Sequence, residues 1–358
     1  MSGRPACWWI EMAEAFINAR PRFRVDGNDD AAMAEAVKDV AIQQPLSGRA
    51  HAEIRLINWG RVDNAEAPGF VFQQIRHGAV IDIRIGEQDQ QALFSGDVTA
   101  IEERYGDGAP QLLLLVEDKM HLLARQRHTR RFEEQSLDDV LRALADDAGL
   151  SADIQVSSQT GDWHQFNESN LAFMQRLLAP YDIAARWRQG QLRIKAEQAD
   201  GNPPRLSPQD GMEYLRIIAD LNGQPANAKV AGFDLAADQA TSAESAALQP
   251  APSGASGVDL LNELGWPGEA YFPHPFAKTQ GEADKWAAAQ FRGRAKAFLA
   301  GEAVCTGNVE FAAGREVELT DVSERLRGRY QIVHCSHRFD SSQGFRSFLK
   351  LNRADWSA

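Results

Sequence analysis

His334, Cys335 and His337 are the residues whose types and spacing first suggest chemistry, because thiolate and imidazole groups are common zinc ligands. Side chains alternate along an extended strand, so His334 and His337 would point to opposite faces of a sheet. Cys335 and His337 would share a face, but zinc needs three or four ligands and no second Cys or His cluster supplies the others. We therefore predict no metal site, and interpret His337 as a packing or hydrogen-bonding residue of a strand.

Recognisable catalytic motifs are missing from the sequence. It contains no G-x-S-x-G elbow, P-loop, Rossmann glycine fingerprint or H-E-x-x-H motif. The paired aspartates at 138–139 and 146–147 share a helical pattern with a leucine stripe, so a solvated helix face explains them. A carboxylate pair drawn from distant segments stays open. We predict a non-enzymatic protein with no catalytic residues, no cofactor and no metal.

Charge and composition narrow the classes of partner. The chain of 358 residues carries 50 acidic and 38 basic side chains, a formal net charge of −12, which argues against sequence-specific nucleic-acid binding. It has no apolar run of about 18 residues, so stable membrane insertion is not expected. The cysteines Cys7, Cys305 and Cys335 are widely spaced and odd in number, which favours reduced thiols over a disulfide framework.

Short strand patterns separated by glycine turns dominate residues 21–119. Examples are "HAEIRLINW", "AVIDIRIG" and "APQLLLLVED"; in the second, Ile81, Ile83 and Ile85 line one face. This spacing favours an antiparallel sandwich or barrel over a βαβ array.

The period then changes to that of helices. Ser136 can cap a helix with a stripe of buried leucines that Gly149 ends, and Ser169 or Asn167 can cap a second one through "NLAFMQRLL". The segments "IAARWR" and "QLRIKAE" predict a hairpin that turns at Gln189 and Gly190.

The composition of residues 236–280 shifts to Ala, Ser, Pro and Gly, which predicts a linker or a long mobile loop. An alanine-rich helix over about 282–299 should follow, closed by Gly301. Strands return at "EAVCTGNV", "REVELTD", "RYQIVHCSHRF" and "FRSFLKLNR", and "DSSQG" at 340–344 should turn the last two into an antiparallel hairpin.

These elements predict a β-rich α+β fold with two β regions around a small α/β insertion and an additional helix. The expected segments are an N-terminal amphipathic segment at 1–20, a first β domain at 21–130, a helical α/β insertion at 131–210, strands of the second β domain at 211–235, a linker at 236–280, and a helix with the second β domain at 281–358.

Three segments, in this order, resemble the phage late control D and tail baseplate hub family of contractile injection systems, which includes the hub portion of VgrG-type spikes. The first is "LFSGDVTAIEERYGDGAPQLLLLVEDKMHLLARQRHTRRFEEQSLDDVLRALADDAGL", the second "WHQFNESNLAFMQRLLAPYDIAARW", and the third "AAGREVELTDVSERLRGRY" with the closing hairpin. The sequence departs from the family pattern at Ala313, where proline is frequent, and in the length of the Ala/Ser/Pro segment. The residues that carry the resemblance are Gly96, Asp97, Asp118, Arg131, Phe132, Asn167, Glu168, Ser169, Phe173, Gly314, Gly328, Tyr330 and His337.

The resemblance implies two tube-like antiparallel β barrels per chain and a homotrimer that adapts a hexameric tail tube to a trimeric spike around a central channel. The implied partners are the tail tube protein, a separate spike protein and baseplate wedge proteins. The implied location is the cytoplasm during assembly and then the baseplate of a virion, tailocin or extracellular injection particle. Two alternatives stay open: a tail-associated cell-envelope hydrolase, and an effector or cargo-docking module.

Overall fold

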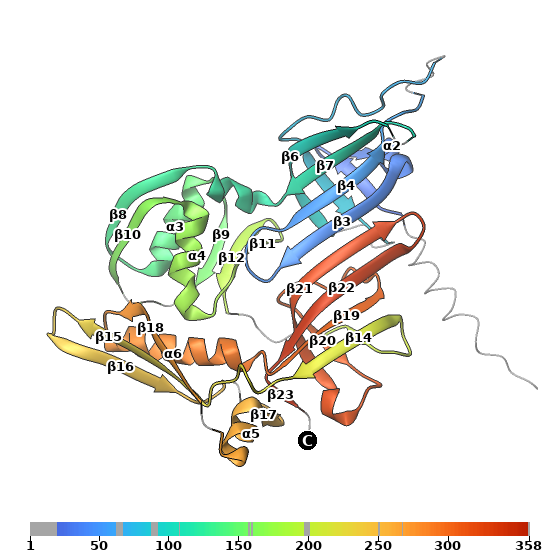
Figure 1. Ribbon diagram of the computed structural model, residues 1–358. Helices are drawn as coiled ribbons and strands as arrows, with labels where there is room; N and C mark the ends of the chain where they lie inside the picture. Colours follow the sequence, from blue (N-terminus) through green and yellow to red (C-terminus); the bar gives the residue numbers. More distant parts are fainter. Residues whose placement is uncertain are drawn as a thin grey trace, which may run out of the picture.

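The computed structural model (Figure 1) describes residues 20–356 apart from 62–66, 87–91, 107, 157, 159, 197–200, 250 and 267, and gives the backbone alone at 273–275. The predicted amphipathic segment at 1–20 and Cys7 therefore lie outside the described residues, except for Arg20. Within this part of the chain, no helix combines the length and the apolar character needed to cross a membrane.

The chain is β-rich, as predicted, and most of its strands join one large sheet of 13 strands (Figure 1). The order along the sheet is β14-β19-β22-β21-β3-β4-β7-β6-β5-β1-β2, with β20 beside β21 and β13 beside β20. Its strands are β1 (Arg22–Val25), β2 (Asn28–Asp30), β3 (Val37–Pro45), β4 (His51–Ile57), β5 (Val80–Arg84), β6 (Phe94–Arg104), β7 (Gln111–Glu117), β13 (Arg205–Leu206), β14 (Met212–Ala219), β19 (Leu299–Thr306), β20 (Glu316–Leu319), β21 (Gly328–Asp340) and β22 (Gly344–Arg353). The short helix α2 (Ala31–Ala36) connects β2 to β3. In the described residues the strand pairings leave this order open at both ends, so they do not form closed barrels.

Two apolar cores lie on the sheet, one for each half. Alternate residues of β4, β5 and β7 supply the first, including Ile54, Ile81, Ile83 and Leu114, each at most 1% exposed. The second core is built around Tyr330, Leu349 and Leu351 with residues of β14 and β19. The predicted alternation of side chains in "AVIDIRIG" and in the closing hairpin is confirmed.

The two halves of the sheet repeat the same arrangement. In chain order, β3, β4, β5, β6 and β7 of the first half correspond to β14, β19, β20, β21 and β22 of the second. The first set lies in the order β3-β4-β7-β6-β5, and the second in the matching order β14-β19-β22-β21-β20. The chain therefore contains an internal repeat of five antiparallel strands. Residue patterns do not indicate it, although the family resemblance implies two β domains per chain.

The repeat holds at the level of single residues. In the first repeat, Val80 of β5 pairs with Asp97 of β6, and at the equivalent place in the second repeat Glu316 of β20 pairs with Gln331 of β21. Each long strand then has a bulge, between Val98 and Ala100 in β6 and between Ile332 and His334 in β21. The N–H of Gly78 donates to the Val98 carbonyl (2.8 Å), and the N–H of Gly314 donates to the Ile332 carbonyl (2.7 Å). Both glycines have φ near +80°, a region that glycine enters without steric cost.

The two repeats are joined edge to edge by β21 and β3, which are antiparallel from the pair His334 and Pro45 to the pair Asp340 and Asp39. Strands that are distant in the sequence thus make one continuous sheet, and in Figure 1 the hairpin of β21 and β22 lies beside β3.

The segment after β7 forms the smaller lobe that contains α3 and α4 (Figure 1). Ser136 caps α3 and Ser169 caps α4, so the two predicted helices are confirmed and the alternative cap Asn167 is not used. The predicted hairpin at Gln189 and Gly190 is also confirmed. The elements are η1 (Lys119–Ala124), β8 (Arg127–Gln135), α3 (Leu137–Asp147), β9 (Ala152–Gln155), β10 (Gly161–Ser169), α4 (Asn170–Leu178), η2 (Ala179–Tyr181), β11 (Ala185–Arg188) and β12 (Gln191–Lys195).

The prediction of a linker at 236–280 is wrong for its secondary structure, because strands and a helix occupy most of this range. A capping box between Ser256 and Asp259 starts α5, whose end is fixed by Gly265 in the left-handed region. The strands of this part form a separate sheet in the order β16-β15-β18, so β15 does not join the second repeat as predicted for 211–235. The elements are β15 (Asn227–Asp234), β16 (Gln239–Ser245), β17 (Ala255–Ser256), α5 (Gly257–Leu264) and β18 (Glu269–Ala277).

The predicted alanine-rich helix is present but shorter than expected. It is α6 (Gln280–Ala295), and Leu299 and Gly301 belong to β19 instead. Gly301 does not close the helix. Its lack of a side chain lets β14 approach, because a Cβ there would collide with the backbone carbonyl of Arg216. The remaining elements are η3 (Glu324–Leu326) and β23 (Asp355–Trp356), which pairs with β17.

Candidate functional site

The predicted signature residues do not form one site. The structure places Gly96, Asp97 and Asp118 where β6 and β7 meet η1, a second group on β8, β10 and α4, and a third group in the second repeat. The first group and Gly314 of the third group hold the smaller lobe to the sheet, and the other contacts stabilise single parts of the fold.

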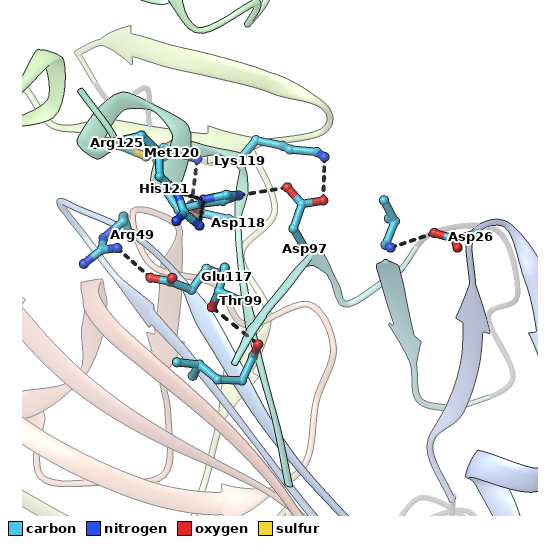
Figure 2. Close-up of polar contacts among 12 residues, drawn as sticks. Asp26, Arg49, Asp97, Thr99, Glu117, Asp118, Lys119, Met120, His121 and Arg125 are labelled. Carbon is cyan, nitrogen blue, oxygen red and sulfur yellow. Dashed lines mark hydrogen bonds and ion pairs between the residues drawn. The ribbon is translucent and has the colours of Figure 1, made fainter. Parts of the chain in front are cut away.

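Asp97 is the centre of the first group (Figure 2). Its carboxylate accepts from Lys119 Nζ at 2.6 Å and from His121 Nε2 at 2.9 Å. Arg125 Nε donates to His121 Nδ1 (3.2 Å), so the ring proton of His121 lies on Nε2 and is donated to Asp97. Burial by itself would raise the pKa of Asp97, but the hydrogen bonds from Lys119 and His121 hold it below its ordinary value. This network fixes η1, and with it the start of the smaller lobe, to strand β6.

Asp118 follows β7 directly and caps η1. Its two carboxylate oxygens accept the backbone N–H groups of Ala50 (2.7 Å) and Met120 (3.0 Å), as Figure 2 shows in part. Burial raises the pKa of Asp118 to about 7. The two backbone hydrogen bonds favour the charged carboxylate and lower the pKa, but their effect is smaller than that of burial. Gly96 packs directly on this corner, where a Cβ would collide with the Glu117 carbonyl.

The second group stabilises the smaller lobe. Phe132 stacks on Phe173 with ring centroids 6.0 Å apart, and Glu168 forms an ion pair with Arg176 (2.8 Å). Asn167 has φ of +49° beside the bulge of β10, and Ser169 caps α4. Arg131 is paired with Asp162 and Glu133 at the surface. These contacts are internal to the lobe, and none of them requires a ligand.

The third group lies in the second repeat. Arg353 passes beside Gly328, whose φ is +132°, and its guanidinium lies 5.6 Å from the ring centroid of Tyr330. Gly314 leaves room for Arg186 of the smaller lobe, which donates to the Ala313 carbonyl at 2.8 Å. Burial, with Arg188 and Arg193 nearby, lowers the pKa of Arg186 to about 10. Gly314 thus lets a side chain of the lobe lock onto the second repeat.

His337 is fully buried. Its Nε2 donates to the Phe311 carbonyl (3.0 Å), and its Nδ1 accepts from the Ser347 hydroxyl (3.0 Å). Cys335 lies on the same face with its sulfur 3.2 Å from Nε2, as strand alternation predicts. Burial lowers the pKa of His337 to about 4. The prediction of a hydrogen-bonding strand residue is therefore confirmed.

Metal ligands and disulfides are not assembled in the part of the chain that the structure describes. It contains no group of three or more His, Cys, Asp or Glu side chains placed to hold an ion. Cys305 and Cys335 are free thiols and buried. The residues that sequence reasoning missed, Lys119, His121, Arg125, Arg186 and Arg353, are the partners of the predicted ones, and nothing in their spacing shows those long-range contacts.

Two strand edges form a further candidate site. In β21, residues 328–331 pair with β20 and residues 334–340 pair with β3. In β6, residues 94–97 pair with β5, but within the described residues 100–104 have a partner only on the β7 side. In the part of the chain that the structure describes, strand β14 pairs with no strand other than β19, and its Tyr214 and Ile218 are 46% and 44% exposed. Unpaired edges of this length invite pairing with another chain.

Solved structures of tail proteins share this fold. A 43 kDa tail protein of prophage MuSo2 from Shewanella oneidensis matches with a TM-score of 0.70 and 14% identity, over 94% of this chain and 99% of that one. A tail protein from Neisseria meningitidis MC58 matches with a TM-score of 0.62 and 12% identity, over 94% and 97%. The E. coli c3393 protein, a type VI secretion component with structural similarity to the T4 tail proteins gp27 and gp5, matches with a TM-score of 0.58 and 11% identity, over 92% and 76%. The protein therefore has the fold of phage tail and secretion-system tail proteins.

The sequence comparison identifies the family. The model described as the Alg8 N-terminal domain matches residues 21–341, so the chain belongs to that family. No curated protein matches the sequence. The family description names a domain and no reaction, and it differs from the late control D family that the sequence resembles.

Proposed function

We propose that this protein is a structural, non-enzymatic baseplate hub of a contractile tail or injection system. In this role it forms a homotrimer that adapts a hexameric tail tube to a trimeric spike, forms part of the central channel and contacts wedge proteins laterally. The support is the tail-protein fold, the late control D resemblance and, above all, the internal repeat of the sheet.

The repeat carries the proposal because it predicts how copies assemble. Within the chain, the second repeat presents β21 to β3 of the first repeat. The equivalent edges, residues 100–104 of β6 in the first repeat and β14 in the second, have no partner on their outer side within the described residues. If β6 of one chain pairs with β14 of the next as β21 pairs with β3, identical contacts propagate around a ring. Three chains would supply six repeats, and each repeat would complete a tube-like β domain.

Such a ring solves a symmetry mismatch. A sixfold tube and a threefold spike cannot make equivalent contacts with each other, whereas a ring that is threefold in chains and sixfold in repeats can contact both. The inserted segments, β8 to β12 after the first repeat and β15 to α6 within the second, occur once per chain and would distinguish the threefold face.

The sheet face opposite the two cores would line the channel. Its charges are mixed and paired across strands: Arg55 lies beside Asp39 (3.3 Å), and Glu302 pairs in register with Lys350. A lining of this kind together with a net charge of −12 would let DNA or an effector pass without strong binding. We expect the location to be the baseplate of a virion, tailocin or extracellular injection particle.

Native mass spectrometry and electron microscopy of the purified full chain, alone and with the tube and spike proteins, test the proposal. The expected result is a ring of three chains with six similar blades that binds tube on one face and spike on the other. A stable monomer with no affinity for either partner would contradict it, as would a zone of lysis on a peptidoglycan zymogram, which the hydrolase alternative predicts.

A further inference from the structure

The contact between the two repeats contains a meeting point of three segments. Along one edge of β21, the pairing with β3 ends where the pairing with the segment before β20 begins. Just after β3, the N–H of Leu46 donates to the Val333 carbonyl (2.9 Å), and just before β20, the N–H of Gly314 donates to the Ile332 carbonyl (2.7 Å). Pro45 is paired with His334. The end of β3 and the segment 312–314 therefore occupy consecutive positions on the same edge. Pro45, Ala312 and Ala313 line one cavity there of about 970 Å³.

The same meeting point can be located on the two free edges by means of the repeat. At the start of β14, Met212 pairs with Cys305, as Val37 pairs with Leu56 at the start of β3, and in both strands a bulge follows. Counting along the two strands from this matched pair makes Asp220, just after β14, the equivalent of Pro45. The turn before Gly78 matches the turn before Gly314: the N–H of Ala79 donates to the Arg76 carbonyl, and that of Arg315 donates to the Ala312 carbonyl. Arg76 and His77 are thus the equivalents of Ala312 and Ala313.

These equivalent positions differ in charge. Inside the chain the junction brings together proline and two alanines, which carry no charge. On the free edges the same positions are the acidic Asp220 on one side and the basic Arg76, followed by His77, on the other, all exposed. The charges of Asp220 and Arg76 are therefore complementary if a second copy joins the two edges.

A half-formed cavity marks the Asp220 side. A space of about 450 Å³ at the end of β14 is lined by Ile218, Asp220, Gln224, Gly293, Arg294 and Ala300. Ile218 and Asp220 are the equivalents of Gln43 and Pro45, and Pro45 lines the larger cavity inside the chain. The side-chain oxygen Oε1 of Gln224 is buried without a hydrogen-bond partner among the described residues, and Gln224 is 8% exposed.

We propose that this space receives the turn at 73–77 of a neighbouring copy, with Arg76 paired to Asp220 as a charged clasp between chains. The matching register places Glu102 of one copy opposite Ile218 of the next, as Ser336 lies opposite Gln43 within the chain. This inference rests on the proposed ring and adds the residues that join its members.

Cysteine cross-linking tests the register in the full chain with Cys7→Ser as background. Directly opposed residues on antiparallel strands have Cβ atoms about 4.5–5.5 Å apart, close enough for oxidative cross-linking. Glu102→Cys with Ile218→Cys should give covalent oligomers on oxidation. Glu102→Cys with Arg216→Cys, displaced by two residues, should give few, and Ser336→Cys with Gln43→Cys should link within one chain. Equal oligomer yields from the matched and displaced pairs would overturn the register.

Charge exchange tests the clasp. Asp220→Asn keeps the hydrogen bond that Asp220 accepts from the Asn222 N–H, but removes the charge. It should raise the concentration at which oligomers dissociate several-fold, and Asp220→Arg should raise it by about tenfold or more, since three like-charge contacts would repel per ring. Arg76→Asp combined with Asp220→Arg should restore assembly, and the exposed control Glu263→Arg should have no effect.

The outcomes separate this inference from the proposed function. One outcome is that wild-type trimers form while Asp220→Arg and Arg76→Asp each leave the dissociation concentration of the trimer and its salt dependence unchanged. In that case the proposed pairing of Arg76 with Asp220 is wrong, and the hub proposal stands. If the wild type forms no oligomer alone or with its partners, the hub proposal itself fails.

Discussion

The Nδ1 atom of His337 lies 3.0 Å from the hydroxyl oxygen of Ser347, its register partner on the facing strand of the closing hairpin. The Nε2 atom carries the ring proton, because it donates to the Phe311 carbonyl, so Nδ1 accepts the hydroxyl proton of Ser347, which in turn accepts the N–H of Asn308 (3.1 Å). The ring is therefore held uncharged, with a pKa lowered to about 4.

This pKa predicts a defined acid sensitivity. The unfolded chain binds a proton near the ordinary histidine pKa of about 6.5 while the folded protein does not, so the stabilisation is complete above pH 6.5 and is lost as the pH falls toward 4. Between pH 7 and 4.5 the loss should be about 2–3 kcal/mol. Urea unfolding of the wild type and His337→Gln across this range measures it. The difference between the two proteins should shrink with acid, and parallel curves would contradict the assignment.

Gly328 should tolerate no side chain. Its φ of +132° is unfavourable for other residues, and the guanidinium of Arg353 fills the place of a Cβ. We expect Gly328→Val to destabilise the protein by at least about 3 kcal/mol or to abolish soluble expression. Gly27→Val is the control, because Gly27 also has positive φ but open space around it, and should cost about 1–2 kcal/mol. Equal losses in thermal unfolding would show that packing against Arg353 is unimportant.

Removing the charge of Asp97 should loosen the start of the smaller lobe. Asp97→Asn keeps one acceptor oxygen but replaces the other with an NH2 donor, so either Lys119 or His121 loses its partner, and the side chain of Asp97 is only 10% exposed. The expected cost is about 1–3 kcal/mol, with faster hydrogen exchange at 119–125. Arg104→Gln breaks an ion pair on the same strand whose members are 51% and 57% exposed, so it should change stability by less than about 0.5 kcal/mol. A similar exchange rate in both variants would argue against the proposed anchoring.

The two buried thiols should be unreactive in the folded protein. Burial raises the pKa of Cys305 to about 12 and that of Cys335 further, so almost no thiolate exists at neutral pH. In a Cys7→Ser background, we expect Ellman's reagent to titrate neither thiol over minutes in buffer and both in denaturant. Rapid reaction of one thiol in buffer would show that the second core opens locally.

Local patterns were enough to predict the short-range part of this structure. Ser136 indicated the cap of α3, Ser169 or Asn167 that of α4, where the structure uses Ser169, and the alternation around Ile81 indicated a half-buried strand. These signals depend on neighbours within a few residues. The same approach failed at 236–280, where small residues suggested a linker. Tertiary pairing of β16 with β15 overrides that composition, and the capping box at Ser256 was the local signal of a helix.

The internal repeat could not be recognised in the same way. Gly78 and Gly314 are each followed by a short alternating strand, but the side chains that follow differ, and the equivalence appears only in the strand order and in matching hydrogen bonds. The signature residues were found as separate points because their partners, such as Arg353 for Gly328 and Arg186 for Gly314, come from other parts of the chain.

The pairing of β21 with β3 also constrains the timing of folding. Residues 39–45 are synthesised long before residues 334–340, the segment that covers their edge. At typical rates of about 5–20 residues per second, β3 stays uncovered for roughly 15–60 s on the ribosome. During that interval any neighbouring nascent chain can supply a competing strand, so we expect yield in cells to depend on chaperones and on the spacing of ribosomes along the message.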